Sequence, residues 1–164
     1  MSNSVGRLRL LAASAMLAAV TALAPAAKAE DASAAATYKD IEQTLGSVPS
    51  FFKAFPEVGI AGAWTEFKSV QLNPDTALDG KTKELIGLAV ASQIPCEYCV
   101  YFHTAAAKAN GASDEEIREA VAMSAIVRHW STVLNGMQVD LPAFKQEVDT
   151  VMNHAADMAK AKVQ

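Results

Sequence analysis

Helical periodicity is the feature that most limits how this chain can fold. From residue 37 to residue 160, apolar residues recur at intervals of three and four, and Gly and Pro cluster at the junctions between such segments. This spacing places apolar residues on one face of an α-helix. No stretch of four or more residues alternates polar and apolar residues as a half-buried strand does. The sequence therefore predicts an all-α, compact helical domain. Helices are expected over residues 38–45, 49–55, 58–72, 79–92, 95–110, 113–135 and 142–160.

The first 29 residues are interpreted as a secretory signal peptide. Arg7 and Arg9 form a short basic head, residues 8–23 are nearly all Leu, Ala, Val and Met, and residues 27–29 have the A-x-A pattern of a cleavage site. The alternative is an uncleaved anchor, but the apolar run is shorter than the ~20 residues that a spanning helix needs. We therefore expect a periplasmic or secreted protein that leaves the membrane after cleavage. Residues 30–36 are expected to form a disordered leader and residues 37–164 one helical domain.

The charge of the chain limits its partners. The net charge of −4 becomes −7 when the three basic residues of the signal are removed, because the signal holds no acidic residue. An acidic chain without a basic cluster is not expected to bind nucleic acid or an anionic membrane surface. Export also matters for the two cysteines, since disulfides persist in oxidising compartments.

The segment over residues 113–135 is apolar around much of the helix that it predicts. One stripe holds Ala120, Met123, Val127, Trp130, Leu134 and Met137, and a second holds Ala122, Ile126, His129 and Val133. A helix with so broad an apolar surface is usually buried on several sides. Trp130 is therefore expected in the core and His129 in the interior. Because the domain is small, we expect another subunit to supply part of this burial, as in a homo-oligomer.

Both cysteines lie in one short stretch, IPCEYCVYFH at residues 94–103. Cys96, Cys99 and His103 are three and four residues apart, so they share one side of the predicted helix. Cys96 is expected in the first turn, where free backbone N–H groups and the helix dipole favour a thiolate. His103, one turn beyond Cys99, can accept the thiol proton. This pattern is typical of a reactive CxxC centre.

The cysteine pair has two alternative uses, a structural cross-link and a zinc site. A structural cross-link would stabilise little, because a four-residue loop restricts the unfolded chain only slightly. Neighbouring helical Cβ atoms, ~5–6 Å apart, must also move closer to reach the ~3.5–4.5 Å of a disulfide, and strained disulfides are the more easily reduced ones. A zinc site has suitable ligand types in Cys and His, with Glu84 as a possible fourth ligand. It usually draws a second ligand pair from another segment, and no second Cys pair exists.

Glu84 is the carboxylate best placed to assist His103. The break around Pro95 should fold the helix over residues 79–92 back against the CxxC helix. At ~1.5 Å per residue, Glu84 and His103 then lie at the same height, roughly 12–14 Å from the turn. Glu84 is expected to orient His103 or to exchange protons with it. The alternative is a solvated helix residue beside Lys81 and Lys83.

The full pattern is Glu84, eleven residues, Cys96-x-x-Cys99, three residues and His103. It resembles the signature of the alkylhydroperoxidase D-like branch of the carboxymuconolactone decarboxylase family, and residues 111–117 resemble that family's turn into its next helix. One departure is Tyr98, where the best-known member of the branch has a histidine. The decarboxylases of the family lack the CxxC centre, so its presence argues against lactone decarboxylation.

The resemblance implies an all-α fold assembled as trimers or hexamers, and an antioxidant thiol peroxidase or disulfide oxidoreductase activity that uses no cofactor or metal. Cys99 would attack the hydroperoxide, His103 would activate it, Glu84 would complete a proton relay, and Cys96 would resolve the sulfenic acid into a disulfide. A thiol donor would return the electrons. The alternative functions are an exported binding or assembly module with an inert disulfide and a metal-binding protein.

Overall fold

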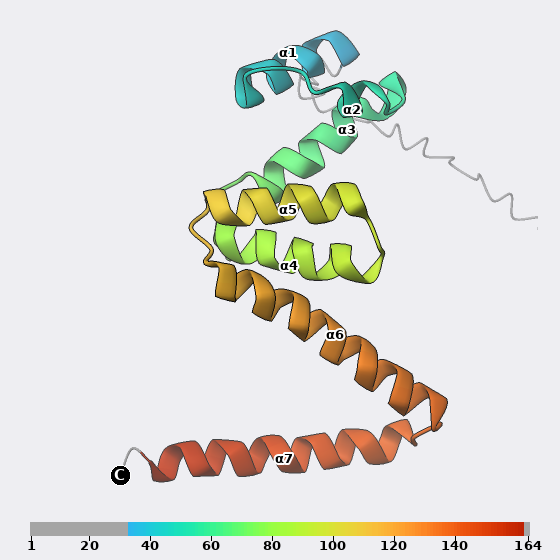
Figure 1. Ribbon diagram of the computed structural model, residues 1–164, viewed down its shortest axis with the longest axis vertical. Coiled ribbons are helices and arrows are strands. Elements are labelled where there is room, and N and C mark those ends of the chain that lie inside the picture. The colour runs from blue at the N-terminus through green and yellow to red at the C-terminus, as the bar shows by residue number, and fades with distance from the viewer. Residues whose placement is uncertain (1–32, 163–164) are drawn as a thin grey trace, which may run out of the picture. The chain divides into compact units, whose positions relative to one another are not determined.

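The computed structural model describes residues 33–162, which form seven α-helices, one π-helical turn and no strand. The predicted all-α fold is confirmed. The predicted signal peptide lies outside the described residues. Within those residues, no helix is both long and apolar enough to cross a bilayer. The elements are α1 Ala34–Leu45, α2 Ser50–Lys53, α3 Glu57–Glu66, η1 Phe67–Gln71, α4 Gly80–Gln93, α5 Glu97–Ala109, α6 Asp114–Gly136 and α7 Leu141–Ala161 (Figure 1).

The chain divides into two compact units between Ala61 and Gly62. The described part of the first unit, residues 33–61, holds α1, α2 and the beginning of α3. Ser33 caps α1, because its Oγ accepts a hydrogen bond from the backbone N of Ala36 at 3.2 Å. The cap starts the helix at Ala34, so the last three residues of the expected disordered leader are helical.

The second unit is built around α4, which packs against both α5 and α6 (Figure 1). Leu88 and Ala91 of α4 are each 1% exposed, and Ala107 of α5 is completely buried. The short connection after Gln93 turns α5 back along α4, as the position of Pro95 predicted. Small buried side chains let the α4 and α5 backbones approach closely, and this places the polar side chains of the two helices within reach of each other.

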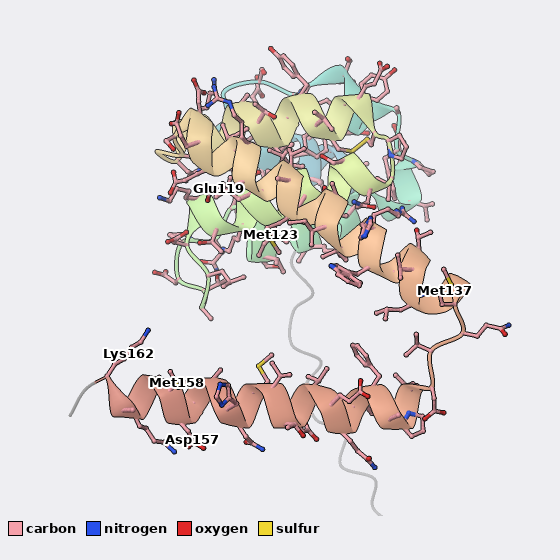
Figure 2. The ribbon with its side chains drawn as sticks, turned by 60° about the horizontal axis from the view of Figure 1, so that its bottom comes forward. Glu119, Met123, Met137, Asp157, Met158 and Lys162 are labelled. Atoms are coloured by element: carbon pink, nitrogen blue, oxygen red, sulfur yellow. A yellow bond between two sulfur atoms is a disulfide. The ribbon has the colours of Figure 1, made fainter. Side chains whose placement is uncertain are left out.

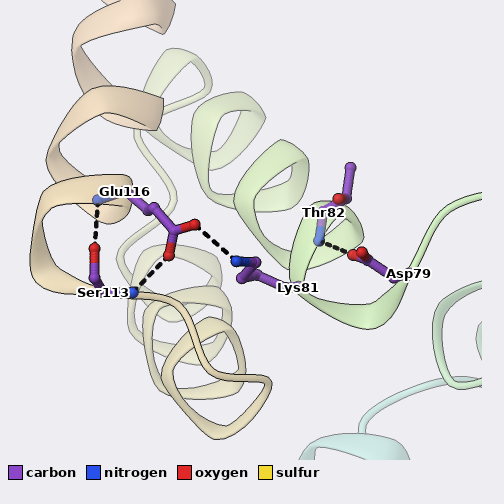
Figure 3. A network of polar contacts seen from close by, with 5 residues as sticks. All are labelled: Asp79, Lys81, Thr82, Ser113 and Glu116. Atoms are coloured by element: carbon purple, nitrogen blue, oxygen red, sulfur yellow. Dashed lines mark hydrogen bonds and ion pairs between the residues drawn. The ribbon is translucent and has the colours of Figure 1, made fainter.

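Polar contacts join the beginnings of α4 and α6 (Figure 3). Ser113 and Glu116 form the predicted capping box: the Ser113 N donates to Glu116 Oε2 at 2.7 Å, and the Glu116 N donates to Ser113 Oγ at 3.1 Å. Lys81 Nζ of α4 donates to Glu116 Oε1 at 2.7 Å. These contacts lower the pKa of Glu116, through Lys81 first and Ser113 second, and Glu116 raises the pKa of Lys81.

The expected single helix over residues 58–72 changes its hydrogen bonding near its end. It is α-helical up to Glu66 and continues as the π-helical turn η1. The backbone N of Leu72 donates to the Phe67 carbonyl, five residues earlier, at 3.2 Å. A π-turn takes in one extra residue, so it changes the direction in which the following side chains point.

The apolar side chains of α6 are largely exposed among the described residues, whereas the sequence predicted that they are buried. Trp130 is 54% exposed and Met123 55%, and the ring of His129 meets that of Trp130 edge-on at 5.5 Å. The predictions of a core Trp130 and an interior His129 are therefore wrong for the single chain, because helix α4 covers only one side of α6. None of the described residues of α7 is buried either, and Met158 is 50% exposed (Figure 2).

Candidate redox site

A buried carboxylate and an imidazole form the centre of the site. Glu84 Oε2 lies 2.7 Å from His103 Nδ1, which confirms that antiparallel α4 and α5 bring these residues to the same height. The side chain of Glu84 is 5% exposed and that of His103 19%. When the Glu84 carboxylate is ionised it can only accept a hydrogen bond, and the N–H at Nδ1 of His103 then donates to Oε2. Nε2 of the neutral ring is then left as a proton acceptor.

Gly87, which sequence reasoning missed, allows this approach. It lies one turn after Glu84 on α4, and a Cβ atom built there would collide with Cε1, Nδ1 and Nε2 of the His103 ring. Glycine inside a helix costs about 1 kcal/mol relative to alanine. A glycine three residues after a candidate relay carboxylate was the sequence signal that could have identified the close contact.

Gln71 of η1 is the second residue that the sequence motif does not contain. Its Nε2 donates to Glu84 Oε1 at 3.1 Å and lies 3.4 Å from Oε2. Both carboxylate oxygens therefore have a partner. Among the described residues, no buried side-chain nitrogen or oxygen lacks a hydrogen bond.

The two cysteines are joined by a disulfide at the start of α5. Their Cα atoms are 5.3 Å apart. The expected position of Cys96 in the first helical turn is wrong by one residue: α5 begins at Glu97, and Cys96 is the extended N-cap. Its Sγ accepts a hydrogen bond from the Cys99 N at 3.2 Å, and its own N donates to the Ala91 carbonyl at 3.2 Å. Cys96 thus connects the end of α4 to the start of α5.

Aromatic rings border the imidazole on the side of η1. The ring of Phe102 meets that of His103 edge-on at 5.3 Å, and Phe67 lies 6.2 Å from Phe102. Apolar neighbours strengthen the Glu84–His103 contact by lowering the local dielectric constant. Tyr98 and Tyr101, beside the cysteines, are instead 88% and 80% exposed.

Comparison with known proteins places the site in a family. Residues 59–140, half of the chain, match the carboxymuconolactone decarboxylase family. The chain belongs to this family. It is 36% identical over 86 residues to "Uncharacterized protein 4 in cox locus" of Paracoccus denitrificans, covering 50% of this chain and 78% of that protein. Residues 59–140, which match the family, contain all four residues of the predicted motif.

A solved structure extends the comparison to the fold. The alkylhydroperoxidase AhpD core of Rhodospirillum rubrum superposes with a TM-score of 0.60 and 31% sequence identity, covering 68% of this chain and 85% of that one. This family member therefore has an AhpD-like helical fold with a CxxC disulfide. Membership points to an enzyme. Among the described residues, no three His, Cys, Asp or Glu side chains are grouped to hold a metal ion.

Proposed function

We propose that this family member is a thiol-dependent peroxidase that reduces hydroperoxides through the Cys96–Cys99 pair. The observation that carries the proposal is the buried contact between Glu84 of α4 and His103 of α5, because His103 lies one turn beyond Cys99 on the same helix. A structural disulfide needs no proton-transfer group beside it. A thiol that must ionise needs a proton acceptor, and the alkoxide that leaves the peroxide needs a proton donor. The description of the Rhodospirillum rubrum relative as an alkylhydroperoxidase supports the same chemistry.

The reaction begins from the reduced pair. His103 Nε2 takes the Cys99 proton, and the thiolate attacks the distal oxygen of ROOH. The O–O bond breaks, His103 returns the proton to the departing alkoxide, and the products are ROH and a Cys99 sulfenic acid. Cys96 then attacks the sulfenic sulfur, forming the disulfide and releasing water. A dithiol donor reduces the disulfide, so the sum is ROOH plus two thiols to ROH, water and a disulfide.

Each residue of the site has one task in this scheme. Glu84 holds Nδ1–H and stabilises the imidazolium formed when His103 takes the thiol proton. Cys96, at the helix N-cap, is the resolving cysteine, and the disulfide that it forms with Cys99 in this scheme is the one present in the structure. Disulfide exchange with a protein substrate would use the same two cysteines without peroxide.

We also propose export and self-association. The signal-like pattern of residues 1–29 supports a periplasmic or secreted site of action. Exposed apolar side chains on α6 and α7, including Val127, Trp130 and Met152, support a homo-oligomer in which copies of the chain cover these faces. A trimer or hexamer matches the assembly implied by the family resemblance. Light scattering that gives the mass of one chain at micromolar concentration would exclude this arrangement.

The proposed activity is tested by peroxide consumption with dithiothreitol as the donor and cumene hydroperoxide as the substrate. The parent should turn over, and Cys99→Ser should not. The alternative of an inert module predicts no turnover and a disulfide that resists mild reductant. A reduction potential below about −300 mV would favour that alternative, and a value near −200 mV would favour a working centre.

A further inference from the structure

We propose that Gln71 is a positioning residue of the redox site, acting on His103 through Glu84; this inference rests on the proposed function of that site. Gln71 lies thirteen residues before Glu84, outside the Glu–CxxC–His motif. Its amide donates to Glu84 Oε1 at 3.1 Å, while His103 occupies Oε2 at 2.7 Å. The hydrogen-bonded relay thus includes Gln71 as a fourth member beyond the cysteine, histidine and glutamate of the sequence motif.

The need for a second donor follows from the burial of Glu84. With its side chain 5% exposed, this carboxylate has little access to water. Burial of a charged carboxylate is unfavourable unless protein donors replace the lost water. His103 lies against Oε2, and the Gln71 amide lies closer to Oε1, at 3.1 Å, than to Oε2, at 3.4 Å. Rotation of the carboxylate would therefore weaken at least one of these hydrogen bonds. The Gln71 amide therefore stabilises the negative charge of the Glu84 carboxylate and holds its orientation toward Nδ1 of His103.

The π-helical turn explains how Gln71 reaches the site. The extra residue between Phe67 and Leu72 rotates the following side chains by about 100° relative to a continuous α-helix. Phe67, in the same turn, contacts Phe102, and Phe102 contacts the His103 ring. One irregular turn therefore supports both members of the Glu84–His103 pair. Such π-turns are frequent at functional sites.

The test uses Gln71→Met, which keeps the length of the side chain and removes the donor. Its matched control is Ser69→Ala in the same turn, because Ser69 Oγ donates to the Glu66 carbonyl and not to the relay. Both are made in a Cys96→Ser background, where Cys99 is the sole thiol. The rate of Cys99 alkylation by iodoacetamide is then followed from pH 5 to pH 9, and thermal unfolding is recorded for every variant.

We expect Gln71→Met to reach its half-maximal alkylation rate at a higher pH than the parent. At pH 7 it should react about 3- to 10-fold more slowly, which is less than the full effect of losing a hydrogen bond to a charged group, because Gln71 acts on Cys99 through Glu84 and His103. Ser69→Ala should follow the parent curve. A Gln71→Met profile that coincides with the parent overturns the inference, and so does an equal shift in Ser69→Ala. If Gln71→Met fails to fold, Gln71→Asn, whose amide is one methylene too short, carries the same test.

Alkylation requires no peroxide, so the inference and the proposed function can fail separately. A parent that consumes no cumene hydroperoxide, with a shifted Gln71→Met profile, removes the peroxidase activity and supports the positioning role. A parent that turns over removes the positioning role alone if Gln71→Met is unchanged in alkylation in the Cys96→Ser background and unchanged in kcat when both cysteines are present. If both stand, Gln71→Met lowers kcat and leaves KM unchanged, because Gln71 acts through Glu84 and does not touch the substrate.

Discussion

The imidazole of His103 lies directly against the backbone of Gly87, where a side chain would occupy the position of the ring. Gly87→Ala should therefore push His103 away from Glu84. We expect peroxide turnover to fall about 10- to 100-fold, since a displacement of about 1 Å in a catalytic group can cost two orders of magnitude. The control is Gly136→Ala at the end of α6, where a Cβ atom meets nothing within 4 Å. Equal activities for the two variants would show that the close approach has no functional role.

Removing the charge of Glu84 tests the proton relay. Glu84→Gln keeps the shape of the side chain but does not stabilise an imidazolium. Turnover of cumene hydroperoxide by this variant should fall about 10- to 100-fold at pH 7. Glu119→Gln, an exposed carboxylate on α6, is the matched control and should retain parental activity (Figure 2). If both variants keep the parental rate, Glu84 serves only packing.

The two cysteines should have separable roles. Cys99→Ser should lose peroxide consumption, since it lacks the attacking sulfur. Cys96→Ser should consume about one equivalent of peroxide without disulfide formation and accumulate a sulfenic acid, detected as a dimedone adduct by mass spectrometry. Dimedone labelling of the Cys99→Ser variant instead would reverse the assignment.

The contact between Lys81 and Glu116 predicts a pH dependence of stability. Glu116 has a lowered pKa in the folded chain, so its contribution is present above its ordinary value of 4.5 and is lost as the pH falls through the folded-state value. Lys81 has a raised pKa, so its contribution is present below 10.5 and is lost as the pH rises through its folded value. The Tm difference between the parent and Glu116→Gln should therefore be largest between these limits. It should shrink below pH 4.5, whereas Asp157→Asn in α7 should follow the parent throughout.

The sequence alone was sufficient to predict those features of the fold and the site that depend on residues close together in the chain. Ser113 and Glu116 predicted the start of α6 because a capping box is read from two residues three positions apart. The Glu84–His103 contact was predicted from the rise per residue of a helix and from the turn around Pro95, which makes α4 and α5 antiparallel. Gln71 was missed because a π-turn depends on tertiary packing. Gly87 was missed because a glycine within a helix does not by itself indicate which side chain lies against it. Trp130 was assigned to the core because an apolar stripe does not reveal which surface covers it.

The central claim is that the Glu84–His103 pair makes Cys99 reactive toward peroxide. The most direct measurement is the single-turnover rate at which reduced protein consumes one equivalent of cumene hydroperoxide at pH 7, in the parent and in His103→Asn. We predict disulfide formation in the parent, with a rate at least ~100-fold higher than in the variant. Parent and variant rates that agree with each other and with that of dithiothreitol alone would contradict the claim.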